Sequence, residues 1–247
     1  MALIATVLTT SLAQGNDRYE SNIKPIEQAR LSDPFEGLNR IIFMFNDTID
    51  TVILRPTAMV YNGLLPNGVR NCVRNFVRNL TTPVILLNDL LQGSGTRANV
   101  TASRFVINTT IGLGGLFDQA EGLGLPYHKE DFGQTIGSWS ESEDPGPYLV
   151  LPVLGPSSAR DAFGLVVDLV SDPLVWSGGE VALNTRWSAT IGGIIDLRSR
   201  TLTMSDNLRK SSDDYYSAVR SVYEQNRDYQ LRNGAPNLLL PAPGDDE

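Results

Sequence analysis

The sequence predicts a mainly α-helical protein with a single domain. Through most of its 247 residues, apolar side chains recur at helical spacing, and proline and glycine mark where helices start and stop. Between residues 33 and 233 there is no linker, internal repeat or break in composition. With 41% hydrophobic residues, the chain is also long enough to bury a sizeable core.

The two ends of the chain lie outside this predicted domain. Residues 1–13 contain an apolar run of the length found in a signal peptide, and residues 11–13 fit a small-x-small cleavage site. No lysine or arginine precedes the run, so we expect an atypical signal peptide, with a short N-terminal helix as the alternative. Residues 14–32 are expected to form a polar connector, and the proline-rich, acidic residues 234–247 a loose tail.

Residues 33–56 predict the first helix. Asp33 is a favourable N-cap, Pro34 suits the first helical position, and Glu36 lies where a capping box has its acid. On a wheel of about 100° per residue, the polar side chains share an arc of roughly 120°, and Phe43 is the apolar exception that falls on it. The arc contains Glu36, Asn39, Arg40, Asn46, Asp47 and Asp50. The rest of the circumference is mostly Phe35, Leu38, Ile41, Ile42, Met44, Phe45, Ile49, Val52 and Ile53.

This narrow polar arc on an apolar cylinder allows two interpretations. An ordinary surface helix has the opposite proportions, a narrow apolar stripe on a polar cylinder. The helix therefore either lies in the core of a globular protein, or faces lipid on most of its circumference and turns the polar arc toward something wet.

Further helices are expected along the rest of the chain. Pro66 and Gly68 open a segment that runs through Arg78, and Thr82-Pro83 is expected to start a separate short helix that ends at Gly93. The later helical segments are 96–111, 158–170, 178–197 and 201–232, the last as one or two helices. Residues 213–232 are expected to form a water-facing helix with an aromatic stripe.

Residues 119–156 differ from the rest because glycine and proline are frequent. We expect loops and turns there, with short extended pieces at 135–139 and 148–153. Gly137, Gly146 and Gly155 alternate with prolines, a pattern that fits either a static irregular hairpin or rigid pieces joined by hinges.

Composition and motifs exclude several kinds of chemistry. The net charge of −8 argues against nucleic-acid binding and against electrostatic docking on an anionic lipid surface, so contact with a membrane would rest on apolar burial. No apolar run of about 18 residues predicts a spanning helix. With one cysteine, Cys72, and one histidine, His128, neither an internal disulfide nor a Cys/His metal cluster is expected.

No catalytic motif stands out either. His128 is expected to be an exposed loop residue, and the acidic pairs at 141–144 and 213–214 to be solvated charge. The glycine pattern at 93–98 follows a predicted helix, not the strand that dinucleotide binding needs. The sequence predicts no enzyme and no cofactor.

Short motifs along the chain resemble the MlaA/VacJ family of outer-membrane proteins. They occur in the family's order over about residues 33–233, nearly the whole chain. They are DPFEGLNRIIFMFN at 33–46, Arg55-Pro56, NLTTP at 79–83, NDLLQG at 88–93, Arg104-Phe105, Asn108-Thr109, GLGG at 112–115, Asp118, EDFGQT at 130–135, GPYLVLP at 146–152, GPS at 155–157 and Arg160-Asp161.

The resemblance implies a ring-shaped helical domain in the inner leaflet of the outer membrane, on the periplasmic side. It implies removal of stray phospholipids from the outer leaflet through an amphipathic channel, and transfer to a soluble periplasmic carrier of the MlaC type. Trimeric porins are implied as partners, and a gate-like hairpin is implied over residues 137–155. Related members carry a cysteine after the signal peptide, whereas this chain has Gln14 and Gly15, which puts the lipid anchor in doubt.

On this basis the candidate site residues come from the first helix and from the apolar helix that starts at Thr82-Pro83. Candidate channel-lining residues are Glu36, Asn39, Arg40, Asn46 and Asp47, with capping and helix–helix hydrogen bonding as the alternative role. Candidate membrane-facing residues are Phe35, Leu38, Ile42, Phe45, Leu86, Leu87, Leu90 and Leu91, with core packing as the alternative. Two other functions stay open, a soluble periplasmic lipid-binding protein and a porin-associated adaptor, with a lipid hydrolase as a distant possibility.

Overall fold

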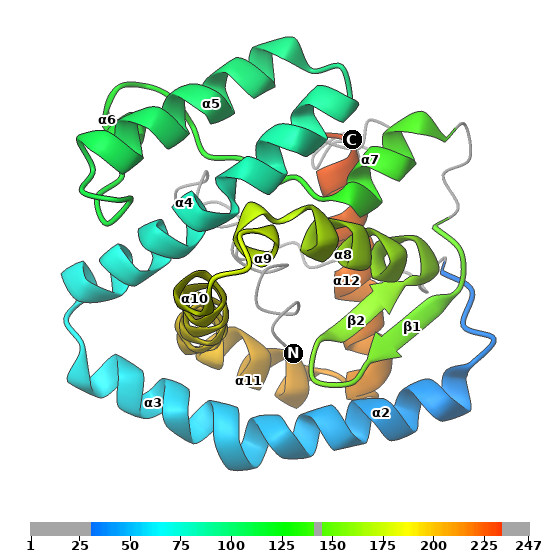
Figure 1. The fold of residues 1–247 in the computed structure, drawn as a ribbon. Helices are drawn as coiled ribbons and strands as arrows, with labels where there is room; N and C mark the ends of the chain where they lie inside the picture. The colour runs from blue at the N-terminus through cyan, green and yellow to red at the C-terminus, as the bar shows by residue number, and fades with distance from the viewer. Residues whose placement is uncertain (1–30, 141–144, 234–247) are drawn as a thin grey trace, which may run out of the picture. The chain divides into compact units, whose positions relative to one another are not determined.

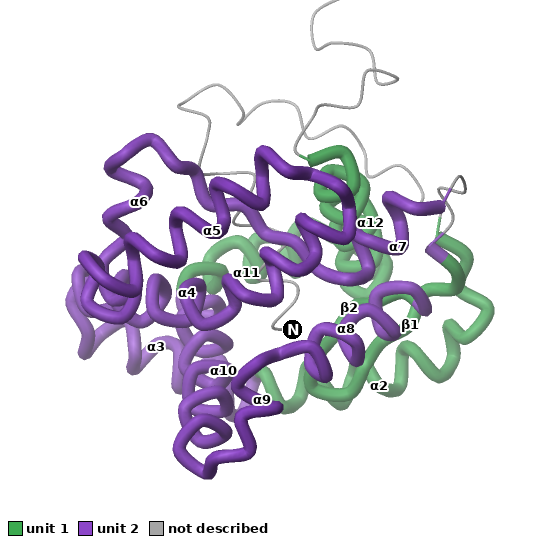
Figure 2. Tube along the Cα trace, turned by 45° about the horizontal axis from the view of Figure 1, so that its top comes forward, with its two compact units in different colours: residues 1–50, 146–158, 200–247 green, residues 51–145, 159–199 purple. Residues whose placement is uncertain are grey.

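The computed structural model describes residues 31–140 and 145–233. The predicted signal peptide, nearly all of the connector, the acidic residues 141–144 and the C-terminal tail lie outside these ranges. The described chain is mainly helical, as predicted, with one small sheet (Figure 1). It divides into two compact units, each built from separate stretches of sequence (Figure 2). That residues 33–233 form a single domain stays a prediction.

Unit 1 combines the first helix, a hairpin and the last two helices. Its elements are α2 (Glu36–Ile49), β1 (Tyr148–Leu151), β2 (Gly155–Ser158), α11 (Leu202–Ser211) and α12 (Tyr215–Leu231). The strands pair antiparallel, with Tyr148 opposite Ser158 and Leu151 opposite Gly155. The chain turns between them with Val153 at φ 66° and Gly155 at φ 90°, values that glycine adopts more readily than valine.

The core of unit 1 is aromatic. Phe43 on α2 lies against the rings of Tyr215 and Tyr216, at centroid distances of 5.5 and 5.4 Å and in edge-to-face geometry. Tyr148 on the hairpin contacts Tyr216 and Tyr223 in the same cluster. Phe43, the apolar exception on the polar arc, therefore falls on the face of α2 that is buried.

Unit 2 is helical throughout its described part. It contains η1 (Asp50–Leu54, a π-helix whose first residue belongs to unit 1), α3 (Arg55–Leu64), α4 (Asn67–Leu91), α5 (Gly95–Thr110), α6 (Gln119–Gly122), α7 (Phe132–Trp139), α8 (Ala159–Ser171), α9 (Pro173–Trp176) and α10 (Glu180–Arg200, whose last residue belongs to unit 1). The α4 helix packs on α5, and α7 packs on α8. Gly164 permits the second contact, because a Cβ there would lie 2.3 Å from the backbone nitrogen of Gly133.

Several local expectations were wrong. The first helix starts at Glu36 without a side-chain cap, because the Asp33 carboxylate is engaged in tertiary contacts instead. The two helices expected at 66–78 and 82–92 are one helix, α4, with Pro83 in its interior. Residues 135–139 are helical, since Asp131 caps α7 by accepting from the Gln134 amide at 2.9 Å. The extended piece expected at 148–153 is confirmed over 148–151 as β1, whereas residues 152 and 153 belong to the turn.

The C-terminal helix was also misjudged. Residues 201–232 form two helices, as expected, but α12 is not mainly a water-facing element. It buries Tyr216, Val219 and Tyr223 in the unit 1 core, and it also buries polar residues such as Asn226 and Gln230. The polar composition of α12 therefore reflects internal polar contacts, not solvent exposure.

Candidate functional site: an apolar exterior over buried polar clamps

The distribution of side chains is inverted relative to an ordinary globular protein. Among the described residues, 26 polar or charged residues are buried but only 13 hydrophobic ones are, whereas 32 large apolar side chains are exposed. Charged residues are almost never fully buried in soluble proteins unless they are paired. Exposed apolar surface on this scale marks an interaction surface for a membrane or a partner.

The α2 helix is the clearest example. Its buried positions are Asn39, Phe43 and Asn46, followed by Asp50, while Leu38, Ile41, Met44 and Phe45 are exposed. Within unit 1, Asn39, Asn46 and Asp50 of the polar arc therefore face inward, whereas Glu36 at the start of the helix is exposed. The apolar circumference is the outside of the helix.

Two of the arc's residues hold the hairpin. The side-chain amide of Asn39 donates to the Tyr148 carbonyl at 3.0 Å, and its oxygen accepts from the Val150 amide at 2.9 Å. Asn46 repeats the arrangement, donating to the Leu151 carbonyl at 2.9 Å and accepting from the Val153 amide at 2.7 Å. Asn39 thus pairs with the free edge of β1 as the backbone of a neighbouring strand would, whereas Asn46 binds the last residue of β1 and the turn that follows it.

The spacing of these two residues explains why they can both reach the strand. Seven residues of helix advance about 10.5 Å. The three-residue step from Tyr148 to Leu151 advances about 10 Å in a strand. The two lengths match, so Asn39 meets the start of the hairpin strand and Asn46 meets its end and the turn. We call this pair of asparagines, with the backbone groups that they bind, the asparagine clamp.

The charged residues of the arc bind partners in unit 1. Arg40 makes two hydrogen bonds to Asp214, at 3.1 and 2.6 Å, and one to Glu36 at 2.8 Å, and it lies over the Tyr216 ring. The Arg40 guanidinium holds the pKa of the Asp214 carboxyl well below its usual range. Asp47 pairs with Arg209 on α11. Glu36 and Arg40 keep substantial solvent access, unlike Asn39 and Asn46.

Asp33 joins the same unit from outside the helix. Its carboxylate accepts from Asn39 at 2.8 Å, from Arg220 at 3.0 Å and from the hydroxyl of Tyr216. Burial, followed by the hydrogen bond to Asp33, raises the pKa of the Tyr216 hydroxyl. The residue predicted to cap α2 instead links α2 to α12.

The predicted membrane-facing residues mostly lie on the surface. Ile42 and Leu86 are half-buried, and Ile42 packs against the unit 1 core. The exposed members of the set are Phe35, Leu38, Phe45, Leu87, Leu90 and Leu91. Each of these positions can therefore contact lipid.

Unit 2 contains a second set of polar contacts, around the C-terminal part of α4. Asn88 donates to Asp168 on α8 at 2.9 Å and accepts from Thr135 on α7 at 2.7 Å. Gln92 donates to Thr135 at 3.1 Å and to Glu130 at 2.8 Å. Burial raises the pKa of the Asp168 carboxyl to about 6. We call these five side chains the α4 polar network.

Next to this network lies His128, which corrects the expectation of an exposed loop residue. Its Nε2 is 3.0 Å from both oxygens of Asp89, which is fully buried, and 3.3 Å from the Thr101 hydroxyl. In a hydrolytic triad the two imidazole nitrogens serve the nucleophile and the acid separately. Here one nitrogen faces both groups, so the geometry is that of a structural contact.

The resemblance motifs turn out to be paired in space. The NDLLQG motif at 88–93 meets EDFGQT at 130–135 through Asn88, Gln92 and their partners. The first motif at 33–46 meets GPYLVLP at 146–152 through the asparagine clamp. The sequence analysis did not single out Asn88, Asp89 and Gln92 as a group. The signal was available, because these three polar residues interrupt or follow directly an otherwise apolar segment at 84–91.

The hinge residues have different settings. Gly137 lies within α7, Gly146 precedes β1 with φ 77°, and Gly155 opens β2. Cys72, the single cysteine, lies on α4 and is half-buried. Gly93-Ser94-Gly95 joins two helices, so the setting for dinucleotide binding is missing, as predicted from the preceding helix.

The described ranges contain neither a metal site of clustered ligands nor a membrane-spanning helix. No group of three or more His, Cys, Asp or Glu side chains within residues 31–140 and 145–233 could hold a metal ion. None of the helices in these ranges is both long enough and apolar enough to cross a bilayer.

Known proteins share this arrangement of sequence and fold. A family model described as "MlaA lipoprotein" matches residues 31–230. "Intermembrane phospholipid transport system lipoprotein MlaA" of Escherichia coli K12 is 34% identical over 239 residues, covering 95% of this chain and 88% of the relative. An uncharacterized protein of Rickettsia felis is 35% identical over 233 residues, covering 92% of this chain and 90% of the relative.

A solved structure agrees. It is described as "Structural basis for maintenance of bacterial outer membrane lipid asymmetry", and it matches with a TM-score of 0.69 at 34% identity. The match covers 81% of this chain and 99% of that chain. The extent of the family match, the full-length relatives and the shared fold lead to one conclusion: the chain belongs to the MlaA lipoprotein family.

Proposed function

We propose that this protein removes phospholipids from the outer leaflet of the outer membrane and passes them inward, so that the lipid asymmetry of that membrane is maintained. The observation that carries the proposal is the inverted distribution of side chains, with apolar surface outside and polar networks inside. Membership of a family whose curated relatives belong to an intermembrane phospholipid transport system supports it.

The physical problem in such transport is the lipid headgroup. Moving an unpaired polar or charged group through hydrocarbon costs several kcal/mol, and a polar passage removes that cost. Helices with a broad apolar face and a polar arc can supply a lipid-facing surface and a polar surface together. Of the candidate lining residues, Glu36 and Arg40 suit contact with a headgroup best, because they keep solvent access while Asn39 and Asn46 are occupied by the hairpin.

The proposed location is the periplasmic side of the outer membrane. Apolar burial would hold the protein there, through exposed side chains such as Phe45 on α2 and Leu90 on α4. A trimeric porin and a soluble periplasmic lipid carrier of the MlaC type are the proposed partners. The carrier would accept the lipid, so no energy source within this chain is required.

The protein is proposed to act without catalysing a reaction. The contact between His128 and Asp89 supports this, because one ring nitrogen faces both the carboxylate and the Thr101 hydroxyl and no group is poised as an activated nucleophile there. Purified protein that cleaved phospholipid would revive the hydrolase alternative.

The test is the phospholipid content of the outer leaflet with and without the gene. We expect the content to rise on deletion and to return to normal when the chain is restored. No change on deletion, with folded protein present in the wild type, would contradict the proposal. In that case porin co-purification without a lipid phenotype would favour the adaptor, and recovery in the soluble periplasm with bound lipid would favour a soluble carrier.

A further inference from the structure

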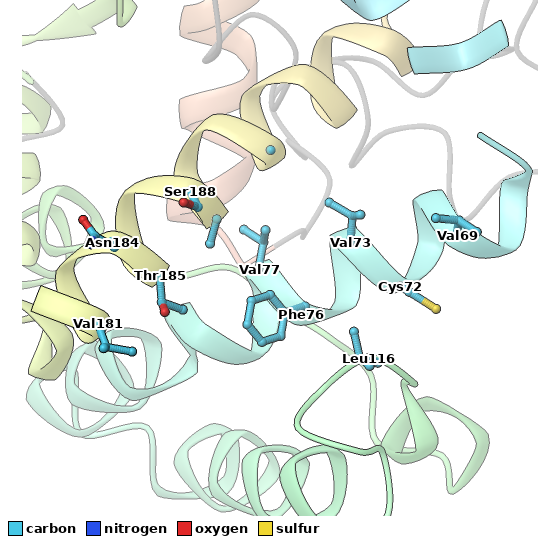
Figure 3. Close-up of a pocket in the computed structure, with 12 residues that line it drawn as sticks. Val69, Cys72, Val73, Phe76, Val77, Leu116, Val181, Asn184, Thr185 and Ser188 are labelled. Carbon is cyan, nitrogen blue, oxygen red and sulfur yellow. The ribbon is translucent and has the colours of Figure 1, made fainter. Parts of the chain in front are cut away.

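A groove in unit 2 lies between α4 and α10, and none of its lining residues belongs to the α4 polar network (Figure 3). Its volume is about 840 Å³, within the range of about 300–1,000 Å³ that is usual for small-molecule sites. Val73, Phe76 and Val77 line it from α4, and Thr185, Ser188 and Gly192 line it from α10. We call it the α4–α10 groove.

The lining selects the chemistry of the occupant. None of its side chains is charged, and its polar members, Asn184, Thr185 and Ser188, all belong to α10. A phosphate group or an acidic peptide would find no opposite charge there, and burying it unpaired would be unfavourable. A flexible, uncharged hydrocarbon chain needs no such partner and gains free energy from each methylene that leaves water.

Small residues on α10 keep the groove open. An added Cβ at Gly192 would lie 3.7 Å from Val73 Cγ1, which is ordinary contact, so a longer side chain at this position would extend into the groove. At the neighbouring Gly193 an added Cβ would lie 3.2 Å from Val77 Cγ1. These glycines let α10 approach α4 closely while leaving space beside the contact.

The groove is open at the surface. Val181 is 80% exposed, and Val69 and Leu116 are also exposed although all three line the groove. Asn184 and Ser188 add exposed polar groups on the α10 side. An occupant could therefore enter from the surface along the apolar side chains. This combination separates the groove from a buried packing defect, which has no entrance.

We propose that the α4–α10 groove binds one acyl chain of a phospholipid during its passage. This inference rests on the proposed function, since it names the part of the lipid that the groove would hold. A helix of a partner protein could also cover an apolar groove, and this is treated as an outcome of the test.

Cys72 provides the probe, because it lines the groove and is the sole cysteine in the sequence. The full chain in detergent would carry a small bimane fluorophore at Cys72 and receive phospholipid with a nitroxide quencher either midway along the acyl chain or on the headgroup. We expect the chain-labelled lipid to quench at near-equimolar ratio and the headgroup-labelled lipid to quench much less. The rate at which a maleimide modifies unlabelled Cys72 should fall when unlabelled lipid is added.

A variant whose side chain fills the groove can be compared with a control variant on the same helix. Gly192→Leu should raise the lipid concentration for half-maximal quenching about tenfold, the loss expected when about two methylenes lose their contacts. The fold should persist, because leucine favours a helix interior over glycine, and circular dichroism would check this. Ile191→Phe adds volume to an exposed α10 residue that does not line the groove, and should leave quenching unchanged.

The outcomes separate this inference from the proposed function. Equal quenching by both lipids, no quenching, or a folded Gly192→Leu variant that is quenched like the wild type would overturn the acyl-chain site. So would a Cys72 that only a purified porin protects from maleimide. If deletion changes lipid asymmetry while Cys72 stays unquenched, the function stands and the groove does not bind lipid. If Cys72 is quenched as expected but asymmetry never changes, the site stands and the transport role fails.

Discussion

At the scale of single residues, the asparagine clamp shows how polar side chains replace backbone pairing. Asn39 uses its donor and acceptor on the free edge of β1, and Asn46 uses its own on the end of β1 and the following turn, so neither leaves an amide unsatisfied. A serine or threonine could not donate and accept with the same reach. The clamp therefore requires asparagine chemistry at a separation of seven residues.

Asn46→Ala should destabilise unit 1. The change leaves the Leu151 carbonyl and the Val153 amide without their partner, which costs about 1–3 kcal/mol for a buried group. Hydrogen exchange of the hairpin amides and the denaturant midpoint in detergent would measure the effect. Thr48→Ala is the control, because Thr48 is exposed and its hydroxyl donates to the Met44 carbonyl one turn earlier in the same helix. Hairpin amides protected equally in both variants would contradict the clamp.

The sequence identified these residues but not their role. A helical wheel places Asn39, Asn46 and Phe43 on one side of α2, and it does so correctly. Whether that side faces water or protein depends on the hairpin, which follows about a hundred residues later. Local spacing carries no information about partners so distant, so the inward direction of the arc could not be predicted.

The Asp168 carboxyl predicts a pH dependence. Its pKa in the fold is about 6 and is raised mainly by burial, whereas an unfolded aspartate has a pKa of about 3.9. The folded state thus holds the proton to higher pH, and the stability that this contributes below about pH 4 is lost as the pH rises through about 6. As the pH rises from about 4 to 6 in detergent, the free energy of unfolding of the wild type should fall by on the order of 1–3 kcal/mol relative to that of Asp168→Asn.

The comparison of two variants isolates this group from the other carboxylates. Asp213→Asn changes an exposed aspartate and should follow the wild type through the same pH range. Parallel stability curves for the wild type and Asp168→Asn between about pH 4 and 6 would show that the Asp168 pKa is not raised.

At the scale of elements, a proline can lie at the start of a helix or in its interior, and the sequence did not distinguish the two cases for Pro83. Thr82-Pro83 was interpreted as a helix start because proline suits the first helical position. In α4 the same proline lies inside a 25-residue helix, where it cannot donate to the Asn79 carbonyl. The Thr81 and Thr82 hydroxyls bond the Arg78 carbonyl at this point, at 3.0 and 2.9 Å. Packing on α5 and the α4 polar network keep the helix continuous.

The α2 helix offers a matched pair of phenylalanines that tests its two faces. Phe43 is 8% exposed and lies in the aromatic core, whereas Phe45 is 53% exposed. Phe43→Ala should lower the stability of the protein in detergent by about 3–5 kcal/mol. Phe45→Ser should leave that stability nearly unchanged, and instead weaken partitioning into lipid vesicles by about 1.5–3 kcal/mol, roughly 10- to 100-fold.

Denaturant unfolding in detergent and flotation with vesicles would give the two readouts. The prediction is that Phe43→Ala changes mainly the unfolding curve, whereas Phe45→Ser changes mainly the flotation. Loss of folding in Phe45→Ser, or normal flotation, would show that the exposed face of α2 does not bind lipid.

At the scale of the whole molecule, charge and apolar surface point to different ways of meeting a membrane. The net charge of −8 repels an anionic surface, while the 32 exposed large apolar side chains among the described residues favour hydrocarbon. Composition alone gives the negative net charge, and it predicts that any membrane contact must rest on apolar burial. It could not predict that the excess apolar residues lie outside, because their number is ordinary and only their placement is inverted.

Membrane binding of the full chain should therefore not depend on anionic lipid or low salt. Electrostatic attraction is screened over about 10 Å at 0.1 M salt and about 3 Å at 1 M, whereas apolar burial is insensitive to this screening. We expect flotation with zwitterionic vesicles to be equal at low and high salt, and flotation with anionic vesicles to be no better at low salt. Binding that required anionic lipid and disappeared in high salt would mean that a basic patch, not the apolar exterior, holds the protein at the membrane. It would also remove the main physical support for the proposed transport role.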